Sequence, residues 1–200
     1  YTIVHSADST LQIGATESIT EYRYRGASPK NYVTFNNEVW RIIGVFPVDD
    51  GNGNIENRIK LIRNESIGEY YWNTTEVSST SSYNNWTGAT LNTYLNIDYY
   101  NTFLSNTKKM VSSAKYYLGG YNDVTQTSQD MYSYERKISG SDYYYSTNPN
   151  SWVGKLGLMY VSDYGYASAN CETKKLSDTE TTDLRACNDT NWLYNIKVDE

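Results

Sequence analysis

Three short stretches in the first third of the chain have the apolar patterns of β-strands. Residues 39–46 (VWRIIGVF) are largely apolar on both faces, which predicts a central strand. Pro47 lacks a backbone donor and predicts the end of that strand. Residues 58–63 (RIKLIR) alternate polar and apolar positions, as a half-buried strand does. Together with residues 32–35 (YVTF) and a tight turn at Asn36-Asn37, these stretches predict an antiparallel meander.

The middle and the end of the chain predict short helices and further strands. A helix that is capped by Thr87 or Thr90 and ends at Asn96 places Leu91 and Leu95 on one face. The remaining expected elements are helical pieces at 99–104 and from 105 or 106 onward, a helical turn at 162–167, and strands at 116–118, 152–160 and 191–198.

Long polar segments separate these elements. Residues 1–20 show no clear period, which predicts an extended leader or linker. Residues 121–151 are rich in Tyr, Ser, Thr, Asn and Gly and predict a long loop, and such loops are often functional. We therefore expect a leader over residues 1–20 and a single domain over residues 21–200.

The composition points to a core built from aromatic rings. Hydrophobic residues make up only 38% of the 200 residues, and the mean hydropathy is -0.69, values that alone indicate disorder. The chain nevertheless carries 22 Tyr, 5 Trp and 3 Phe, and each ring can bury a large area. We expect a folded domain with Trp40 and Trp86 in its core.

Charge and hydropathy argue against two classes of partner. The net charge is -6 and no run of Lys or Arg exceeds two residues, whereas proteins that bind nucleic acids or anionic membranes normally carry a basic patch. No apolar stretch approaches the roughly 20 residues that span a bilayer. We therefore expect no nucleic-acid partner and no direct membrane insertion.

The sequence contains no recognisable catalytic or cofactor motif. His5 is the one histidine, it lies in the expected leader, and a catalytic triad needs a histidine held by a third group. Two cysteines cannot complete a structural zinc site. Catalysis by a pair of carboxylates stays open, because any two of the 23 acidic residues can meet in a cleft. We expect a non-catalytic protein without a cofactor.

Two sets of residues have competing structural interpretations. Cys171 and Cys187 either form a disulfide in an oxidising compartment, worth about 3 kcal/mol, or stay as separate thiols. Asp50, Asn52 and Asn54 place oxygen atoms at alternate positions as calcium loops do. The turn residue and the bidentate Glu of such loops are absent, however, so a strand-to-strand turn explains the same residues.

Aromatic residues in polar loops are the candidate binding residues. Tyr with Ser, Gly and Asn is the composition of antibody-like binding loops, because Tyr gives rigid amphipathic contact area. The alternative is that the rings fold back over a thin core. The candidates are Tyr143, Tyr144, Tyr145, Trp152 and Trp72.

Several strings occur in an order that resembles a known group of proteins. They are NYVTFNNEVWRIIGVF (31–46), RIKLIRNESIG (58–68), NNWTGATLNTYLN (84–96), AKYYLGGY (114–121), YERKIS (134–139) and WVGKLGLMYVSDYGYA (152–167). Over residues 22–193 the chain resembles uncharacterised surface proteins of low-GC Gram-positive bacteria. That group is similar to the C-type-lectin-like fold shared with formylglycine-generating enzymes and variable receptor-type binding proteins.

The resemblance implies an α+β, C-type-lectin-like fold with small antiparallel sheets, two or three short helices and long loops. Group members continue past the NWL string with two closing strands, and this chain departs from them after Leu193. The resemblance therefore implies a C-terminally incomplete domain. It also implies a cysteine pair at Cys171 and Cys187. The catalytic cysteines of the formylglycine-generating enzymes have no matching motif in this chain, so the resemblance implies no enzymatic role.

We expect an extracellular, cell-surface binding or adhesion module that uses its Tyr- and Trp-rich loops for a glycan or protein ligand. One alternative is a structural subunit or stalk domain of a pilus-like fibre, whose N-terminal segment pairs with a neighbouring subunit in self-assembly. A carboxylate-based enzyme is the other alternative, and it predicts paired acids with perturbed pKa values in one cleft.

Overall fold

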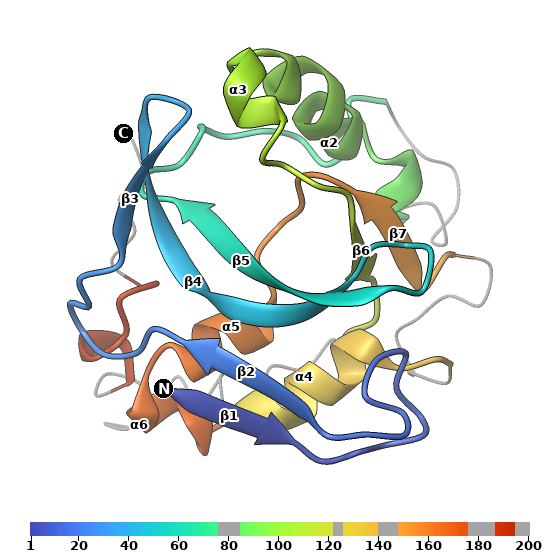
Figure 1. The fold of residues 1–200 in the computed structure, drawn as a ribbon, viewed down its shortest axis with the longest axis vertical. Helices are drawn as coiled ribbons and strands as arrows, with labels where there is room; N and C mark the ends of the chain where they lie inside the picture. The colour runs from blue at the N-terminus through green and yellow to red at the C-terminus, as the bar shows by residue number, and fades with distance from the viewer. Residues whose placement is uncertain (76–84, 122–125, 140–147, 176–186, 195–200) are drawn as a thin grey trace.

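An antiparallel sheet of five strands forms one layer of the protein (Figure 1). The computed structural model describes residues 1–75, 85–121, 126–139, 148–175 and 187–194. The strands are β1 (Thr2–His5), β2 (Ile19–Arg23), β3 (Tyr32–Phe35), β4 (Glu38–Asp49) and β5 (Ile55–Arg63). Strands β2 and β3 pair with successive parts of one edge of β4, and β5 pairs along the opposite edge.

The central strand β4 confirms the predicted meander. Asn36 and Asn37 both have positive φ (56° and 59°) at the tight turn that joins β3 to β4, as Asn tolerates. The β4–β5 register shifts between Ile42 and Gly44, which marks a bulge. Gly44 is required there, because a Cβ atom would lie 2.1 Å from the carbonyl oxygen of Tyr22. Strand β4 continues through Pro47, so the predicted end at this proline is wrong.

Short helices and a second sheet form the next part of the fold. They are η1 (Trp86–Gly88), α2 (Thr90–Thr93), η2 (Tyr94–Tyr99), α3 (Ser105–Lys108), β6 (Ala114–Tyr117) and β7 (Ser151–Gly154). The helices lie close to the predicted positions. Strand β7 is shorter than the expected strand over residues 152–160, and it pairs antiparallel with β6.

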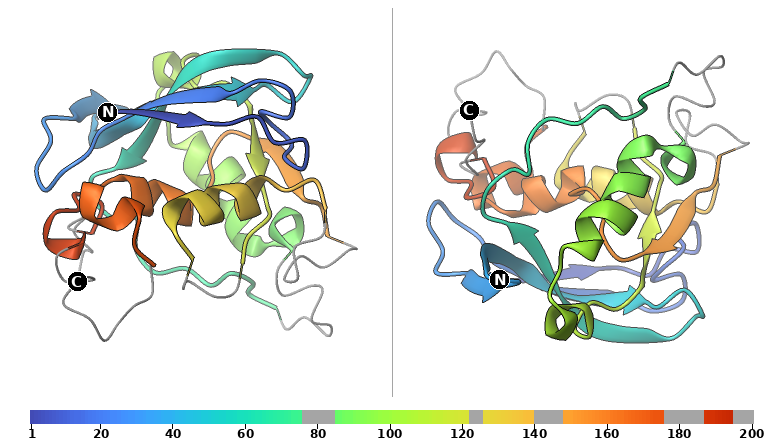
Figure 2. Two further views of the ribbon diagram at one scale, coloured as in Figure 1. Left: turned by 90° about the horizontal axis from the view of Figure 1, so that it is seen from below. Right: turned by 90° about the horizontal axis from the view of Figure 1, so that it is seen from above.

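Three helices lie against the face of the sheet formed by β1 and β2 (Figure 2). They are α4 (Ser128–Arg136), α5 (Val161–Tyr166) and α6 (Ala169–Glu172). Helix α4 lies inside residues 121–151, so the expectation of one long loop there is wrong. The helix begins with a capping box in which Thr127 and Asp130 satisfy each other's backbone amides. Its buried positions include Glu135 and Arg136, so its inward face does not look apolar in the sequence.

Residues 1–20 belong to the fold and are not the expected leader. Strand β1 pairs with β2 over its whole length, and Ile3, Leu11 and Ile13 are buried. Leu11 also forms a bridge with Lys137 beyond the end of α4. The alternation in β1 is only four residues long, too short for periodicity to reveal it.

Three hydrophobic clusters fill the interior. The first joins Ile43 and Phe46 of β4 to Trp192, which is fully buried. The second lies between β1 and α4, and the third surrounds Trp86. Trp40 and Trp86 are buried, as predicted. The described part of the expected strand at 191–198 is a turn that brings Trp192 into the core.

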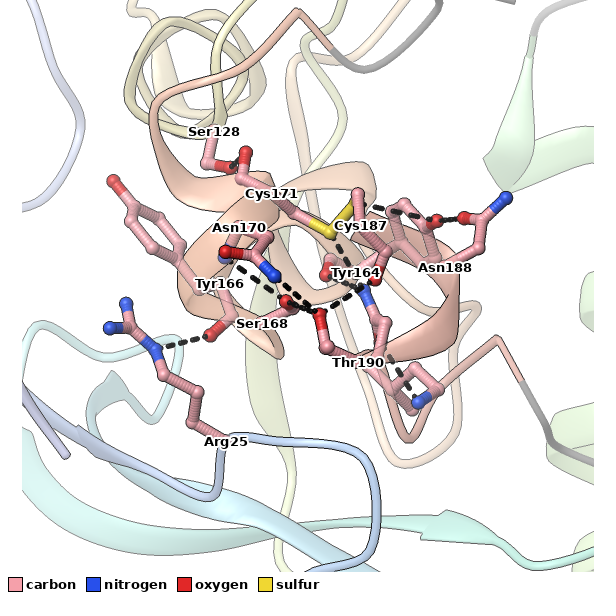
Figure 3. Close-up of a disulfide and its surroundings, with 12 residues drawn as sticks. Arg25, Ser128, Tyr164, Tyr166, Ser168, Asn170, Cys171, Cys187, Asn188 and Thr190 are labelled. Atoms are coloured by element: carbon pink, nitrogen blue, oxygen red, sulfur yellow. Dashed lines mark hydrogen bonds between the residues drawn. A yellow bond between two sulfur atoms is a disulfide. The ribbon is translucent and has the colours of Figure 1, made fainter. Parts of the chain in front are cut away.

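The structure joins Cys171 to Cys187 in a disulfide (Figure 3), the first of the two alternatives above. The bond connects α6 to the turn at residues 187–190, whose Thr190 hydroxyl lies 2.7 Å from the Ser168 hydroxyl. Ser128 of α4 donates a hydrogen bond to the carbonyl oxygen of Cys171 (3.3 Å). The C-terminal described residues are therefore held onto the helical layer. Among the described helices, none is long and apolar enough to cross a membrane.

Candidate functional site

Trp72 and Trp152, two of the predicted binding residues, both pack against Trp86. The ring centroids of Trp72 and Trp86 lie 5.4 Å apart, and those of Trp86 and Trp152 lie 5.9 Å apart. Both outer rings are half-buried and belong to the third hydrophobic cluster. The structure therefore places them in the packing role that competed with the binding role in the sequence.

The other predicted binding residues, Tyr143, Tyr144 and Tyr145, lie outside the described residues. Their proposed contact with a ligand stays a prediction.

A different group of aromatic side chains forms an exposed surface beside Trp72. Tyr71 is 82% exposed and Tyr70 is 44% exposed, and both directly precede the half-buried Trp72. The Tyr70 ring stacks on the Tyr94 ring of η2 at 4.3 Å, and their hydroxyl oxygens lie 2.7 Å apart. Ile97, one turn further along η2, is also exposed. We call Tyr70, Tyr71, Tyr94 and Ile97 the tyrosine surface.

Hydrogen bonds to α2 hold the segment that carries this surface. The backbone N–H of Leu91 donates to the carbonyl oxygen of Trp72 (3.1 Å), and the N–H of Thr90 donates to Asn73 Oδ1 (3.2 Å). The N–H of Thr74 in turn donates to the Thr90 hydroxyl (3.2 Å). These bonds follow directly after Tyr70 and Tyr71, so the exposed rings start from an anchored backbone.

The hydrogen bond within the tyrosine surface also affects its chemistry. The pKa of Tyr94 is raised, first because its hydroxyl is bonded to Tyr70 and then because of burial and the nearby Asp98 carboxylate. The Tyr94 phenol therefore stays neutral at physiological pH, and its hydroxyl can donate or accept a hydrogen bond. The surface offers flat rings and uncharged polar atoms rather than charge.

Sequence reasoning missed Tyr70 and Tyr71, although the string YYW contains them. The sequence-based prediction names Trp72 of this string and leaves out the two tyrosines before it. No local pattern marks them, because their exposure depends on which ring of the segment packs on Trp86.

A buried charged network lies between β2 and the helices α4 and α5. Arg23 Nη1 lies 2.9 Å from Asp163 Oδ1, and Arg23 Nη2 lies 2.8 Å from Glu21 Oε2. Lys60 of β5 donates to the other oxygen of Asp163 at 2.5 Å. The side chains of Glu21, Arg23 and Asp163 are at most 3% exposed, so the network ties the sheet to α5 out of contact with solvent.

His5 belongs to this network and is not in a loose segment. Its ring stacks on Tyr132 at a centroid distance of 3.5 Å, its Nδ1 lies 3.0 Å from Gln129 Oε1, and its Nε2 lies 3.2 Å from Glu21 Oε2. The side chain is 2% exposed. Its contacts therefore fix β1 and β2 to α4.

The carboxylates of the network have pKa values displaced in opposite directions. Burial alone would raise the pKa of Glu21 and Asp163, but their cationic neighbours, Arg23 for Glu21 and Lys60 with Arg23 for Asp163, hold both at about 2. Burial raises the pKa of Glu135 and outweighs its neighbour Arg136 and the hydrogen bonds from Ser162. Perturbed acids do gather here, as the enzyme alternative predicts. They are buried and bonded, which equally fits a structural network.

In the candidate calcium loop at the β4–β5 turn, both oxygens of the Asp50 carboxylate accept hydrogen bonds from the loop itself. Asp50 Oδ1 accepts the backbone N–H of Asn52 (2.7 Å) and Asn54 (3.3 Å), and its Oδ2 accepts the Asn54 side-chain amide (3.0 Å). These bonds lower the pKa of Asp50 to about 2, and the hydrogen bond from the Asn54 side chain has the largest effect. Within the described residues, no group of three or more His, Cys, Asp and Glu side chains could hold a metal. The geometry favours the turn interpretation.

Comparisons with protein families, curated proteins and solved structures found no match to this chain.

Proposed function

We propose that this protein is a non-catalytic, extracellular binding or adhesion module that uses the tyrosine surface to bind a carbohydrate or protein ligand. The observation that carries the proposal is the exposure of Tyr71 beside the stacked, hydrogen-bonded pair of Tyr70 and Tyr94. The predicted contribution of Tyr143–Tyr145 remains part of this proposal.

The chemistry of the surface suits ligands with both apolar faces and hydroxyl groups. A tyrosine ring gives a flat apolar face and loses few rotamers on binding, while its hydroxyl donates and accepts hydrogen bonds. A sugar ring offers the complementary features, with C–H groups on its faces and hydroxyls at its rim. Stacking of Tyr70 on Tyr94 fixes two of the rings before any ligand arrives, which lowers the entropic cost of binding.

Two further features are consistent with this assignment. Disulfides persist in oxidising compartments, so the Cys171–Cys187 bond supports a location at the cell surface. The fold is mixed α+β with small antiparallel sheets and short helices. We propose that it is a C-type-lectin-like variant, which agrees with the resemblance in the sequence.

The alternative of a pilus-like or stalk subunit has less support. That hypothesis expects the N-terminal segment to pair with a neighbouring subunit. In the structure, β1 pairs with β2 of the same chain, and the Tyr1 amino group donates to the carbonyl oxygen of Arg23 (2.9 Å).

The proposal is tested by probing an array of bacterial and mammalian glycans with the 200-residue chain and measuring any hit by biolayer interferometry. We expect Tyr71→Ala to weaken binding at least tenfold without changing the melting temperature. Tyr194→Ala is the matched control, because Tyr194 is 58% exposed and lies outside the tyrosine surface.

Equal losses in the two variants would show that the tyrosine surface is not the binding site. If no glycan binds, the same variants are compared in binding to extracellular-matrix proteins. A failure in both panels would contradict the proposed function.

A further inference from the structure

A cavity of about 950 Å³ is lined by β5 and by the part of the chain that runs from η2 to β6. Its volume is within the range of sites that enclose a small molecule, about 300–1,000 Å³. Leu61 of β5, Leu95 of η2 and Phe103 line it, together with Trp40 of β4. These side chains make a large part of the cavity wall apolar.

Part of this apolar lining is in contact with solvent. Ile59 is 63% exposed, Met110 is 66% exposed and Leu158 is 49% exposed. Exposed apolar side chains that gather around one cavity are typical of an interaction site. The cavity is therefore accessible to a molecule that comes from outside the protein.

The cations that line the cavity already have partners within the chain. Five of the six in the described lining have a carboxylate of this chain within 3.6 Å, and these are Arg58, Lys60, Arg63, Lys115 and Arg136. The sixth, Lys155, donates to the Tyr100 hydroxyl (2.8 Å). An anionic occupant would have to compete with these ion pairs, whereas an uncharged apolar group leaves them intact.

Tyr160 lies between β5 and β6, which excludes a further strand at this position. Lys60 Nζ lies 4.4 Å from the Tyr160 ring centroid, and the Tyr117 N–H donates to the Tyr160 hydroxyl (2.7 Å). A peptide in the cavity would leave backbone N–H and C=O groups without partners, which is costly in an apolar space. A hydrocarbon chain has no such groups, so the cavity favours a hydrocarbon over a peptide.

The cavity and the tyrosine surface share one side chain. Tyr70 lines the cavity, and its ring also stacks on the Tyr94 ring at 4.3 Å. Leu91 and Leu95, which lie on either side of Tyr94 in the sequence, line the cavity as well. A ligand that binds at Tyr70 can therefore extend an apolar substituent directly into the cavity.

We propose that the cavity holds the alkyl chain of an amphipathic ligand whose uncharged sugar head binds to the tyrosine surface. The inference rests on the function proposed above, and it narrows the ligand class to neutral glycolipids and alkyl glycosides. The sugar contacts the rings of the tyrosine surface, and the chain covers the apolar lining that includes Ile59 and Leu61.

The test measures binding of butyl, hexyl and octyl β-glycosides to the 200-residue chain by isothermal titration calorimetry, each below its critical micelle concentration. Glycosides of glucose, galactose and N-acetylglucosamine are compared, because the same effect of chain length is expected for any head that binds. Each methylene that enters the cavity should tighten binding about fourfold, so octyl glycosides should bind about a hundredfold or more tightly than butyl glycosides.

Three variants separate the chain from the head. Ile59→Asp places a charge in the cavity lining, and Ile55→Asp places the same charge at a similarly exposed position of β5 (56%) outside the described lining. We expect Ile59→Asp to lower the affinity for octyl glycosides at least tenfold and to leave the affinity for butyl glycosides nearly unchanged. Ile55→Asp should change neither affinity. Tyr71→Ala should weaken binding of all three chain lengths by the same factor.

A brominated chain reports where the alkyl end lies. Bromine quenches tryptophan fluorescence at short range, and Trp40 lines the cavity. An 8-bromooctyl glycoside should quench part of the fluorescence of the chain. Trp40→Phe should remove most of this quenching and keep the affinity for the octyl glycoside.

The possible failures are distinguishable. Equal affinity for butyl and octyl glycosides would overturn this inference and leave the proposed function standing. An effect of chain length without any loss in Tyr71→Ala would show that the head is not on the tyrosine surface, and it would contradict both. Binding only above the critical micelle concentration, or unchanged quenching in Trp40→Phe, would place the chain outside the cavity and overturn the inference.

Discussion

The two sides of β4 are filled in contrasting ways. Toward β2, α4 and α5, the space is closed by ion pairs, and Arg23 and Asp163 are almost fully buried. Toward β5, a cavity lined by apolar residues such as Ile59 remains open. In this chain a charged residue is therefore no sign of exposure, and an apolar residue is no sign of burial.

Aromatic rings make the closed side possible. The Arg23 guanidinium lies 4.6 Å from the Phe46 ring centroid and 5.0 Å from that of Tyr166, while Arg136 lies 3.7 Å from the Tyr132 ring. Ring faces attract cations, so the tyrosine-rich composition supplies walls that tolerate buried guanidinium groups. The open side also has aromatic rings in its lining, among them Trp40, Tyr99 and Phe103, and a cavity remains between them and β5.

Arg23→Met should give the largest loss, because it leaves Glu21 and Asp163 with fewer cationic partners inside the closed side. We expect the free energy of unfolding to fall by about 3–5 kcal/mol, measured by urea denaturation. Arg58→Met is the control, since its ion pair with Glu56 is at the surface and should contribute about 0–1 kcal/mol. Similar losses in the two variants would contradict the contrast between buried and exposed pairs.

Trp40→Ala tests the aromatic packing at the border of the open side. The Trp40 ring meets Phe35 edge-on at 5.7 Å and Phe103 at 6.2 Å. We expect a loss of about 3–4 kcal/mol by urea denaturation, toward the lower end for a buried tryptophan because the adjoining cavity admits water. A loss under about 1 kcal/mol would mean that these rings do not form a cooperative core.

Replacing both Cys171 and Cys187 by Ser should destabilise the closed side by about 3 kcal/mol, as expected for a loop of 16 residues. The measurement is the melting temperature of the double variant beside that of the parent chain. A parent whose melting temperature does not change on full reduction would contradict the structural role of the bond.

The closed side should also make stability depend on acid. Glu21 and Asp163 have folded-state pKa values of about 2, below their ordinary 4.5 and 3.8. A lowered pKa contributes stability that is complete above the unfolded-state value and is lost as the pH falls toward the folded-state value. We expect roughly 2–3 kcal/mol per group to disappear between about pH 5 and pH 2.

The raised pKa of Glu135 acts with the opposite sign, because ionisation of its carboxyl at higher pH destabilises the fold. Urea denaturation from pH 2 to pH 7 measures the sum. Asp163→Asn should reduce the dependence of the free energy of unfolding on pH by the contribution of Asp163. Glu135→Gln should increase that dependence. An unchanged slope in Asp163→Asn would show that Asp163 is not the titrating group.

The sequence predicts the strands with strong periodicity and fails where polar residues turn inward. Strands β3, β4 and β5 and the helices from 86 to 108 follow from apolar spacing and turn residues. Strand β1 and helix α4 could not be found this way, because His5, Glu135 and Arg136 are buried polar residues that mimic a solvated face. Only the tertiary contacts reveal that each has a partner of opposite charge or a ring.

The candidate site could be predicted only in kind. The composition predicts a binding surface rich in Tyr and Trp. Which of these side chains are exposed depends on which of them pack on Trp86, and Trp86 lies more than ten residues from Trp72 in the sequence. The cavity that β5 and β6 both line carries no local signal in the sequence, because its walls come from segments that are distant along the chain.

The disulfide also determines how the protein responds to mechanical force. A force that pulls the chain at Trp192 away from α6 is carried by the disulfide between Cys171 and Cys187, whose Cα atoms lie 4.9 Å apart. The residues between them then add no length. When the bond is reduced, the same segment should extend the chain by about 50 Å. The domain therefore has two lengths under tension, and the redox state of its surroundings selects between them.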